Sequence, residues 1–251
     1  MKKIVFNDKM SLVQKIALAG LFIALTTILQ KVIAVNYIGA LPFLRVTFGG
    51  CSLIIYSSIV LGPFWGLLIG ASSDLLGYLI FDPKSTAFLP QITFIYALLG
   101  FASYFIYKGI KMIKNDKALL ITEYSVYALL FVGATLFLEL YPGIELWARI
   151  SFPIIIFALF IVLIVCNIFI SKHFKKRNVD DRINVHTISF SCFLIELLIM
   201  IGFGSLMKGW AFGFSTYPII LICQILVAFV NIPLNTFLIS YIMFFTRKYI
   251  S

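Results

Sequence analysis

Charged residues are scarce in this sequence. They make up 12% of its 251 residues, and Asp and Glu together number only 10, whereas about a quarter of a typical soluble domain is charged. Hydrophobic residues reach 62% of the chain. This balance excludes a water-soluble globule and also an intrinsically disordered chain, because disorder requires few apolar residues. The composition is that of a protein embedded in a lipid bilayer.

Residues that form disulfides or hold metals are also few. The four cysteines lie inside apolar stretches without a C-x-x-C motif, and the two histidines flank a basic linker without a Cys or carboxylate at ligand spacing. We therefore expect no disulfide framework, no metal site and no other cofactor. The residues concerned are Cys51, Cys166, Cys192, Cys223, His173 and His186.

The motifs of several enzyme classes are missing. The sequence has no G-K-[ST] phosphate-binding loop, no G-x-S-x-G and no H-E-x-x-H, and both histidines fall outside the apolar runs, where no Ser or Cys nucleophile can reach them. An enzyme is therefore disfavoured, although an intramembrane enzyme is kept as an alternative.

The apolar runs predict an all-α integral membrane protein, residues 1–251 forming one transmembrane domain. A crossing needs about 20 apolar residues, and Gly-Pro, Asp-Pro and Pro-Gly pairs separate several of the runs. The second run is short for a crossing. The eight expected spans are 16–33, 48–61, 65–81, 87–107, 119–138, 148–171, 187–206 and 217–245.

The net charge of +10 orients these spans. Lys and Arg concentrate in cytoplasmic loops of membrane proteins, and the dense basic clusters fall on one side only if both termini are cytoplasmic. They lie at residues 2–9, 108–117, 172–182 and 247–248. Since the basic residues sit between apolar runs and form no basic domain, we expect a lipid bilayer and no nucleic acid as partner.

The acidic residues within the spans are the first candidates for function. Asp74 lies in the middle of an apolar helix, where a carboxylate costs about 3 kcal/mol on insertion scales. Arg45 and Lys84 lie near the outer ends of neighbouring spans. One interpretation is an Asp74–Arg45 pair that only stabilises the bundle, and the other is a ligand cavity that opens to the outside. Glu196 is a second intramembrane acid.

The last span carries a polar stripe. Tyr217, Gln224, Asn231 and Asn235 recur at helical spacing, and Pro233 is expected to interrupt the helix beside them. The preceding outer loop, 208–217, contains Trp210 among glycines and aromatics. That loop is either part of an interfacial aromatic belt or a lid over a ligand, and the polar stripe either binds neighbouring helices or lines a cavity.

The first span has a stripe of small residues. Ala17, Gly20 and Ala24 share one helix face, and small residues allow a second helix to approach closely within lipid. Packing inside this bundle and docking to a partner protein are both compatible with this stripe, and the sequence favours neither.

Residues 45–93 resemble the substrate-binding S component of energy-coupling factor (ECF) vitamin transporters, most closely the folate-type branch. The last helix of that branch is similar, more loosely, to residues 218–241. Together the resemblance covers about half of the chain. Its motifs are R-x-T-F-G-G at 45–50, G-P-x-W-G at 62–66, G-x-x-x-D-L-L-G at 70–77, D-P at 82–83 and F-L-P-x-x-T at 88–93.

The resemblance implies a six-helix bundle that captures a vitamin from outside, docks onto a transmembrane T component and relies on two cytoplasmic ATPase subunits. Family-like helices would occupy 11–117 and 183–251, and 118–172 would be an inserted helix pair that brings the total to eight spans. A prokaryotic plasma membrane is implied, with Ala17, Gly20 and Ala24 as the docking face. A stand-alone secondary carrier or a scaffold protein would also fit a chain with this number of spans.

For folate or a related pterin, the resemblance places the cavity in the outer halves of the later helices, where Asp74, Thr93, Trp210 and Gln224 would lie. Arg45, Lys84 and Lys208 are cations for the two ligand carboxylates. The pterin edge would meet Asp74 or Asn231, and its ring would stack on Trp210 or Tyr217. Glu196 stands where the family has an Asn-rich segment, and it completes the set of expected binding residues.

Overall fold

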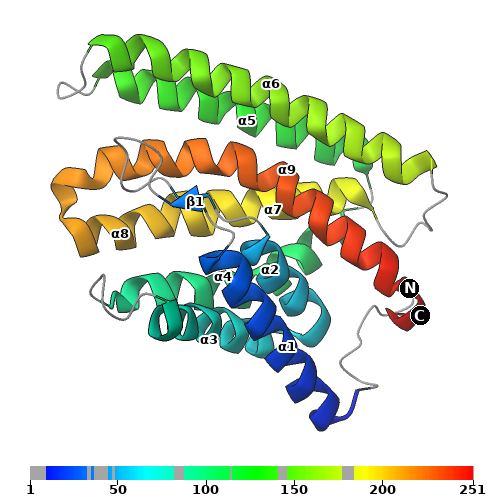
Figure 1. Ribbon diagram of the computed structural model, residues 1–251. Helices are drawn as coiled ribbons and strands as arrows, with labels where there is room; N and C mark the ends of the chain where they lie inside the picture. The colour runs from blue at the N-terminus through cyan, green and yellow to red at the C-terminus, as the bar shows by residue number, and fades with distance from the viewer. Residues whose placement is uncertain are drawn as a thin grey trace.

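The computed structural model describes residues 10–32, 35–36, 45–46, 49–81, 88–113, 115–140, 146–176 and 184–250. Almost all of them are helical (Figure 1). The elements in chain order are α1 (Leu12–Lys31), β1 (Val35–Asn36), β2 (Arg45–Val46), α2 (Gly50–Leu61), α3 (Pro63–Phe81), α4 (Pro90–Ile110), α5 (Asp116–Leu140), α6 (Leu146–Lys176), α7 (Val185–Ile195), a π-helix (Glu196–Gly204), α8 (Ser205–Phe212), a 3-10 turn (Phe214–Thr216) and α9 (Tyr217–Ile250).

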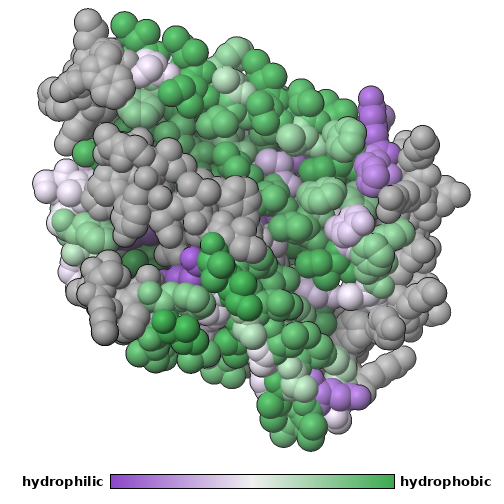
Figure 2. All heavy atoms as spheres, viewed as in Figure 1, coloured by the Kyte–Doolittle hydropathy of each residue, from purple (hydrophilic) through white to green (hydrophobic). Residues whose placement is uncertain are grey.

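The chain is a multi-pass membrane protein. Seven helical stretches in the described part are long and apolar enough to cross a bilayer, with α7, the π-helix and α8 counting as one. Large apolar side chains such as Leu129, Phe157 and Phe169 are exposed on their outer faces, as lipid contact requires. Figure 2 shows a largely hydrophobic surface on which hydrophilic residues gather near helix ends.

The remaining apolar helix, α2, is too short to cross alone. Its 12 residues span about 18 Å, against a hydrocarbon core of about 30 Å. Gly62, with φ of 104°, turns the chain directly from α2 into α3, and this left-handed backbone is open to glycine at no steric cost. The expected second span is thus half of a tight helical hairpin.

The hairpin tip packs against the first helix. α2 runs antiparallel to α1, because Gly50 faces Gln30 at one end and Leu61 packs in one cluster with Ala19 at the other. The turn at Gly62 therefore lies beside the N-terminal half of α1, where Met10 and Leu18 also pack against this cluster.

Glycines bring α3 and α4 into backbone contact. A Cβ on Gly100 would lie 2.0 Å from the carbonyl oxygen of Gly66, and a Cβ on Gly70 would lie 2.1 Å from that of Tyr96. The ring contact between Tyr78 and Phe88 continues the same antiparallel pairing toward the far end. These contacts fix the depth of the hairpin against α4.

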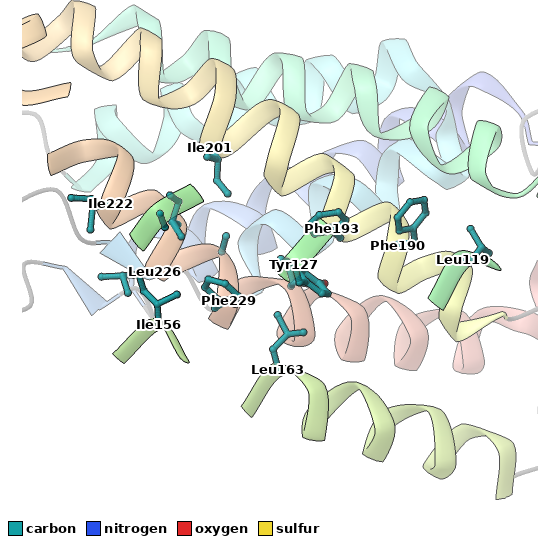
Figure 3. Packing of buried hydrophobic residues seen from close by; sticks show 14 of the residues in the cluster. Leu119, Tyr127, Ile156, Leu163, Phe190, Phe193, Ile201, Ile222, Leu226 and Phe229 are labelled. Carbon is teal, nitrogen blue, oxygen red and sulfur yellow. The ribbon is translucent and has the colours of Figure 1, made fainter. Parts of the chain in front are cut away.

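Helices α5 and α6 pack differently. They lie side by side along one edge of the bundle against α7 and α9 (Figure 1), and large side chains fill the space between these helices. Tyr127 of α5 meets Phe193 of α7 with a centroid separation of 4.5 Å and Phe160 of α6 at 6.4 Å. Figure 3 shows this cluster, which also includes Leu163 and Phe229.

Five helix ends meet at one end of the bundle. Asn184, before α7, donates a hydrogen bond to Asp116 at the start of α5. The ends of α6 and α9 join them through the packing of Phe174 and Phe244. Several lysines of the basic clusters lie at this end, on or beside α4, α5 and α6, among them Lys108, Lys111, Lys117 and Lys172.

Two local expectations differ from the structure. α9 continues through Pro233 without interruption, because helices tolerate proline where neighbouring groups and local adjustment satisfy the freed carbonyl. The expected outer loop at 208–217 is largely helical, since α8 extends to Phe212 and only Gly213, with φ of 96°, and a short 3-10 turn separate it from α9.

Candidate functional site

Glu196 is the centre of a buried polar network. Its side chain is 2% exposed and lies at the point where α7 changes into the π-helix. The Nδ2 of Asn235 on α9 donates to Glu196 Oε1 at 3.3 Å, and the Oγ of Ser52 on α2 donates to Asn235 Oδ1 at 2.6 Å. Asn235 thus links α2 to the Glu196 carboxylate, and three elements that are distant in sequence join in one polar chain within an apolar bundle.

Asn231 and Lys208 extend this network away from the basic helix ends, toward the opposite end of the bundle. Asn231 lies one turn before Asn235 on α9 and also hydrogen-bonds the Glu196 carboxylate, and Lys208 of α8 attracts it electrostatically. The Oδ1 of Asn231 is buried with no hydrogen-bond partner in the structure. Asn231 Oδ1 is thus a buried acceptor of this network that a further hydrogen-bond donor would satisfy.

The π-helix shapes the backbone at this site. It covers nine residues from Glu196 to Gly204, whereas most π-helical segments are single turns inside α-helices and are frequent at functional sites. Its wider coil begins at Glu196 itself.

The expected polar face of the last span is also present, because Gln224, Asn231 and Asn235 are all buried.

Asp74 and Thr93 form a second polar contact. The Oγ1 of Thr93 on α4 donates to Asp74 Oδ2 at 2.6 Å, because the α3–α4 pairing places these residues opposite each other. Beside them, the ring of Phe94 packs at a tilt against that of Phe203 near the end of the π-helix, with a centroid separation of 5.8 Å. Asp74 and Glu196 therefore belong to two separate polar contacts, one between α3 and α4 and one at the start of the π-helix.

The remaining expected binding residues do not join either of these polar contacts in the described part of the structure. Arg45 lies in β2, where its backbone pairs with Asn36, but its side chain falls outside the described residues, as does Lys84. Trp210 on α8 is 63% exposed, the environment of an interfacial aromatic. Tyr217, at the start of α9, packs against Gly209, at which a Cβ would lie 3.1 Å from the tyrosine ring.

The small residues of α1 face outward. Ala17, Gly20 and Ala24 are all exposed, and no atom lies within 4 Å of a Cβ built on Gly20. The opposite face packs into the bundle through residues such as Ala19 and Thr27, and Thr27 Oγ1 donates to the Ser73 carbonyl at 3.1 Å. The small-residue stripe therefore does not serve packing inside this bundle.

Glu123 is a buried acid that was not among the expected site residues. It is 1% exposed and accepts hydrogen bonds from Ser189, Tyr127 and Asn167. It was missed because it lies only two turns from the start of α5 among polar neighbours. The signal that would have found it is the Glu–Tyr pair at i, i+4, which places both side chains on one helix face.

Within the described residues, no three His, Cys, Asp or Glu side chains are grouped to hold a metal ion, and all four cysteines are free thiols. Comparison with protein-family models, with curated proteins and with solved structures finds no match to this chain.

Proposed function

We propose that this chain is the substrate-binding S component of an ECF-type vitamin importer that takes up folate or a related pterin. The observation that carries the proposal is the outward-facing small-residue face of α1, formed by Ala17, Gly20 and Ala24. A helix of the T component docks there, and close helix approach in lipid depends on small residues. The motifs of residues 45–93 point to the same family.

The chain crosses a prokaryotic plasma membrane with both termini in the cytoplasm. The α2–α3 hairpin enters and leaves from the outer side, so it counts as two crossings for orientation even though α2 is short. The end at which α4, α5, α6, α7 and α9 meet carries the lysines and faces the cytoplasm, following the rule that cytoplasmic loops are basic.

The vitamin binds toward the outer side, near Asp74 and the Glu196 network. The buried amide and carboxylate groups of Glu196, Asn231 and Asn235 suit the adjacent N–H donors of a pterin edge. Arg45, Lys84 and Lys208 supply cations for its carboxylates, and Trp210 or Tyr217 supplies an aromatic surface. The chain has no ATPase site of its own and depends on two cytoplasmic ATPase subunits.

The experiment is equilibrium binding of radiolabelled vitamins to the detergent-purified chain. Submicromolar binding of a folate is expected, and Asp74→Asn is expected to weaken it about tenfold because a charge-assisted hydrogen bond is lost. Glu139→Gln, which neutralises an exposed acid on α5, serves as the matched control and leaves binding unchanged.

Absence of submicromolar binding to any folate would contradict the folate assignment. Uptake into liposomes by the chain alone, without ATP or partner subunits, would instead identify a stand-alone secondary carrier. An unchanged affinity in Asp74→Asn would restrict Asp74 to its structural contact with Thr93.

A further inference from the structure

A cavity lies at the basic end of the bundle, away from the site proposed for the vitamin. Its volume is about 390 Å³, which falls in the range of small-ligand pockets. Helices α5, α6 and α7 form its walls. Its polar lining residues are Glu123, Asn167, Ser171, Lys172, His186 and Ser189.

The inner part of this cavity contains the Glu123 carboxylate, which three hydrogen bonds hold in place. Glu123 Oε1 accepts hydrogen bonds from Ser189 Oγ at 2.6 Å, from Tyr127 at 3.0 Å and from Asn167 Nδ2 at 3.4 Å. All three bonds end on the same oxygen, which leaves Oε2 as an acceptor for a ligand. The donors come from α5, α6 and α7, so the carboxylate is held from three sides.

Asn167 supplies a second acceptor. Its side chain is 8% exposed, and its Oδ1 is buried with no hydrogen-bond partner in the structure. An unsatisfied buried acceptor costs about 1–3 kcal/mol, and the amide nitrogen of the same side chain is already directed at Glu123. A ligand that donates several hydrogen bonds satisfies both groups at once.

The charge changes sign toward the mouth. On α6, Ser171 and Lys172 follow Asn167 by four and five residues, which places them about 6–7.5 Å closer to the basic end. His186, in the first turn of α7, lies within 3.3 Å of the Ser171 hydroxyl. The cavity thus has an acidic floor and one lysine, Lys172, at its rim, which matches a ligand whose cationic group enters first and whose anionic group remains outside.

We propose that this cavity binds a phosphoethanolamine group, with the primary ammonium on Glu123 and Asn167 and the phosphate at Lys172. A primary ammonium has three N–H donors, and its bonds to a carboxylate are charge-assisted and strong. The group is available in two forms, as the headgroup of an aminophospholipid in the inner leaflet or as a soluble phosphomonoester. A trimethylated ammonium has no N–H donor and is rejected.

The lipid arm of the test uses the full chain in nanodiscs of phosphatidylglycerol mixed with either phosphatidylethanolamine or phosphatidylcholine. Native mass spectrometry counts the lipids retained. The soluble arm titrates phosphoethanolamine and phosphocholine onto the detergent-purified chain and follows its thermal midpoint. Preference for the ethanolamine form in the first arm identifies the lipid, and preference in the second identifies the soluble compound.

Glu123→Gln is expected to weaken the preferred ligand about tenfold or more, whereas Glu139→Gln, on the same helix but exposed at its other end, leaves it unchanged. If Glu123→Gln fails to fold, Lys172→Gln replaces an exposed residue at the rim and is expected to weaken phosphoethanolamine but not ethanolamine.

Equal binding of ethanolamine and choline forms in both arms would overturn the proposal. So would affinities that neither Glu123→Gln, where it folds, nor Lys172→Gln changes. Either result would leave the cavity filled by water only. Vitamin binding is not used in these measurements, so their failure is distinguishable from failure of the proposed transport function.

Discussion

The α1–α4 region and the α5–α6 pair solve the same packing problem in different ways. In the first region, glycines remove side chains so that the backbones of α3 and α4 touch at Gly66 and Gly100. In the second, rings such as Tyr127 and Phe160 fill the space between helices. Backbone contact requires glycine at fixed positions, whereas many combinations of large side chains fill a gap. Only the first region therefore carries recognisable motifs.

This difference also limits what the motifs mean. Gly62 makes the α2–α3 turn, and Gly66 and Gly70 allow close approach to α4, so these motif glycines have packing roles in this chain. The features that indicate function are therefore the polar residues between these glycines and the outward face of α1. Asp74 is the motif residue that packing alone explains least, because a carboxylate within lipid is expensive.

The largest effect is expected from Gly100→Ala. The added Cβ would lie 2.0 Å from the Gly66 carbonyl oxygen. To relieve this clash, the backbone of α4 would have to move away from that of α3, which disturbs the packing of both helices. We expect a loss of about 3 kcal/mol or more in the free energy of unfolding, measured by denaturant or thermal unfolding in detergent. Gly133→Ala on α5, where the Cβ meets no atom within 4 Å, is the control and should be close to neutral.

A stable Gly100→Ala protein would break the comparison, because backbone contact would then not be what fixes α3 against α4. A loss of stability in Gly133→Ala as large as that in Gly100→Ala would also contradict the comparison, because the effect would then not depend on backbone contact.

An intermediate effect is expected from Asn235→Ala. The change removes the amide between Ser52 and Glu196 and leaves a buried carboxylate with fewer donors, which should lower the free energy of unfolding by about 1–3 kcal/mol. Ser240→Ala is the control on the same helix. Its Oγ is buried with no partner in the structure, so removing it should cost nothing in the same unfolding assay.

If the two alanine variants were equally stable, the Glu196 network would not hold α2, α9 and the π-helix together. The α1–α4 region would then join the rest of the bundle through apolar contacts and the hydrogen bond between Tyr56 of α2 and Thr246 of α9.

The smallest effect on binding is expected from deleting residues 116–183 and joining Asn115 to Asn184. The Asn184–Asp116 hydrogen bond places these chain ends close together, and loss of an even number of helices preserves the orientation of α7 and α9. Phe193 and Phe229 would then contact lipid, which solvates them. We expect a lower thermal midpoint but vitamin affinity within about threefold of the intact chain.

Loss of vitamin binding in a deletion variant that retains its helicity and elutes as a single species would show that α5 and α6 belong to the binding site. The description of them as an inserted pair would then be wrong.

Hydropathy and helix-breaking pairs predicted most of the fold. The expected spans coincide with the helices to within a few residues at most ends, because about 20 apolar residues and a Gly-Pro or Asp-Pro break are strong local signals. The acidic Asp74 and the hydroxyl of Thr93 were also predicted as candidates, although their 2.6 Å contact depends on the register of α3 against α4. Register is a property of packing and has no local signal.

Other features could not be predicted from the sequence. The π-helix after Ile195 has no composition that distinguishes it from an apolar α-helix. The depth of the α2–α3 tip depends on glycine contacts with a helix about 30 residues later. The pairing of Glu123 with Tyr127 is visible in the sequence, but its donors Ser189 and Asn167 are brought to it from other helices. Each of these features arises from tertiary contacts that join distant parts of the chain.

The most direct test of the proposed function is copurification of the tagged chain with a T component and two ATPase subunits coexpressed from the same genome. Ala17→Trp and Ala24→Trp place bulk on the exposed face of α1, and Ala158→Trp places the same bulk on an exposed alanine of α6. We predict that both α1 variants lose the partners while retaining vitamin binding, and that Ala158→Trp keeps both. Retention of the partners by both α1 variants would contradict the proposed docking face.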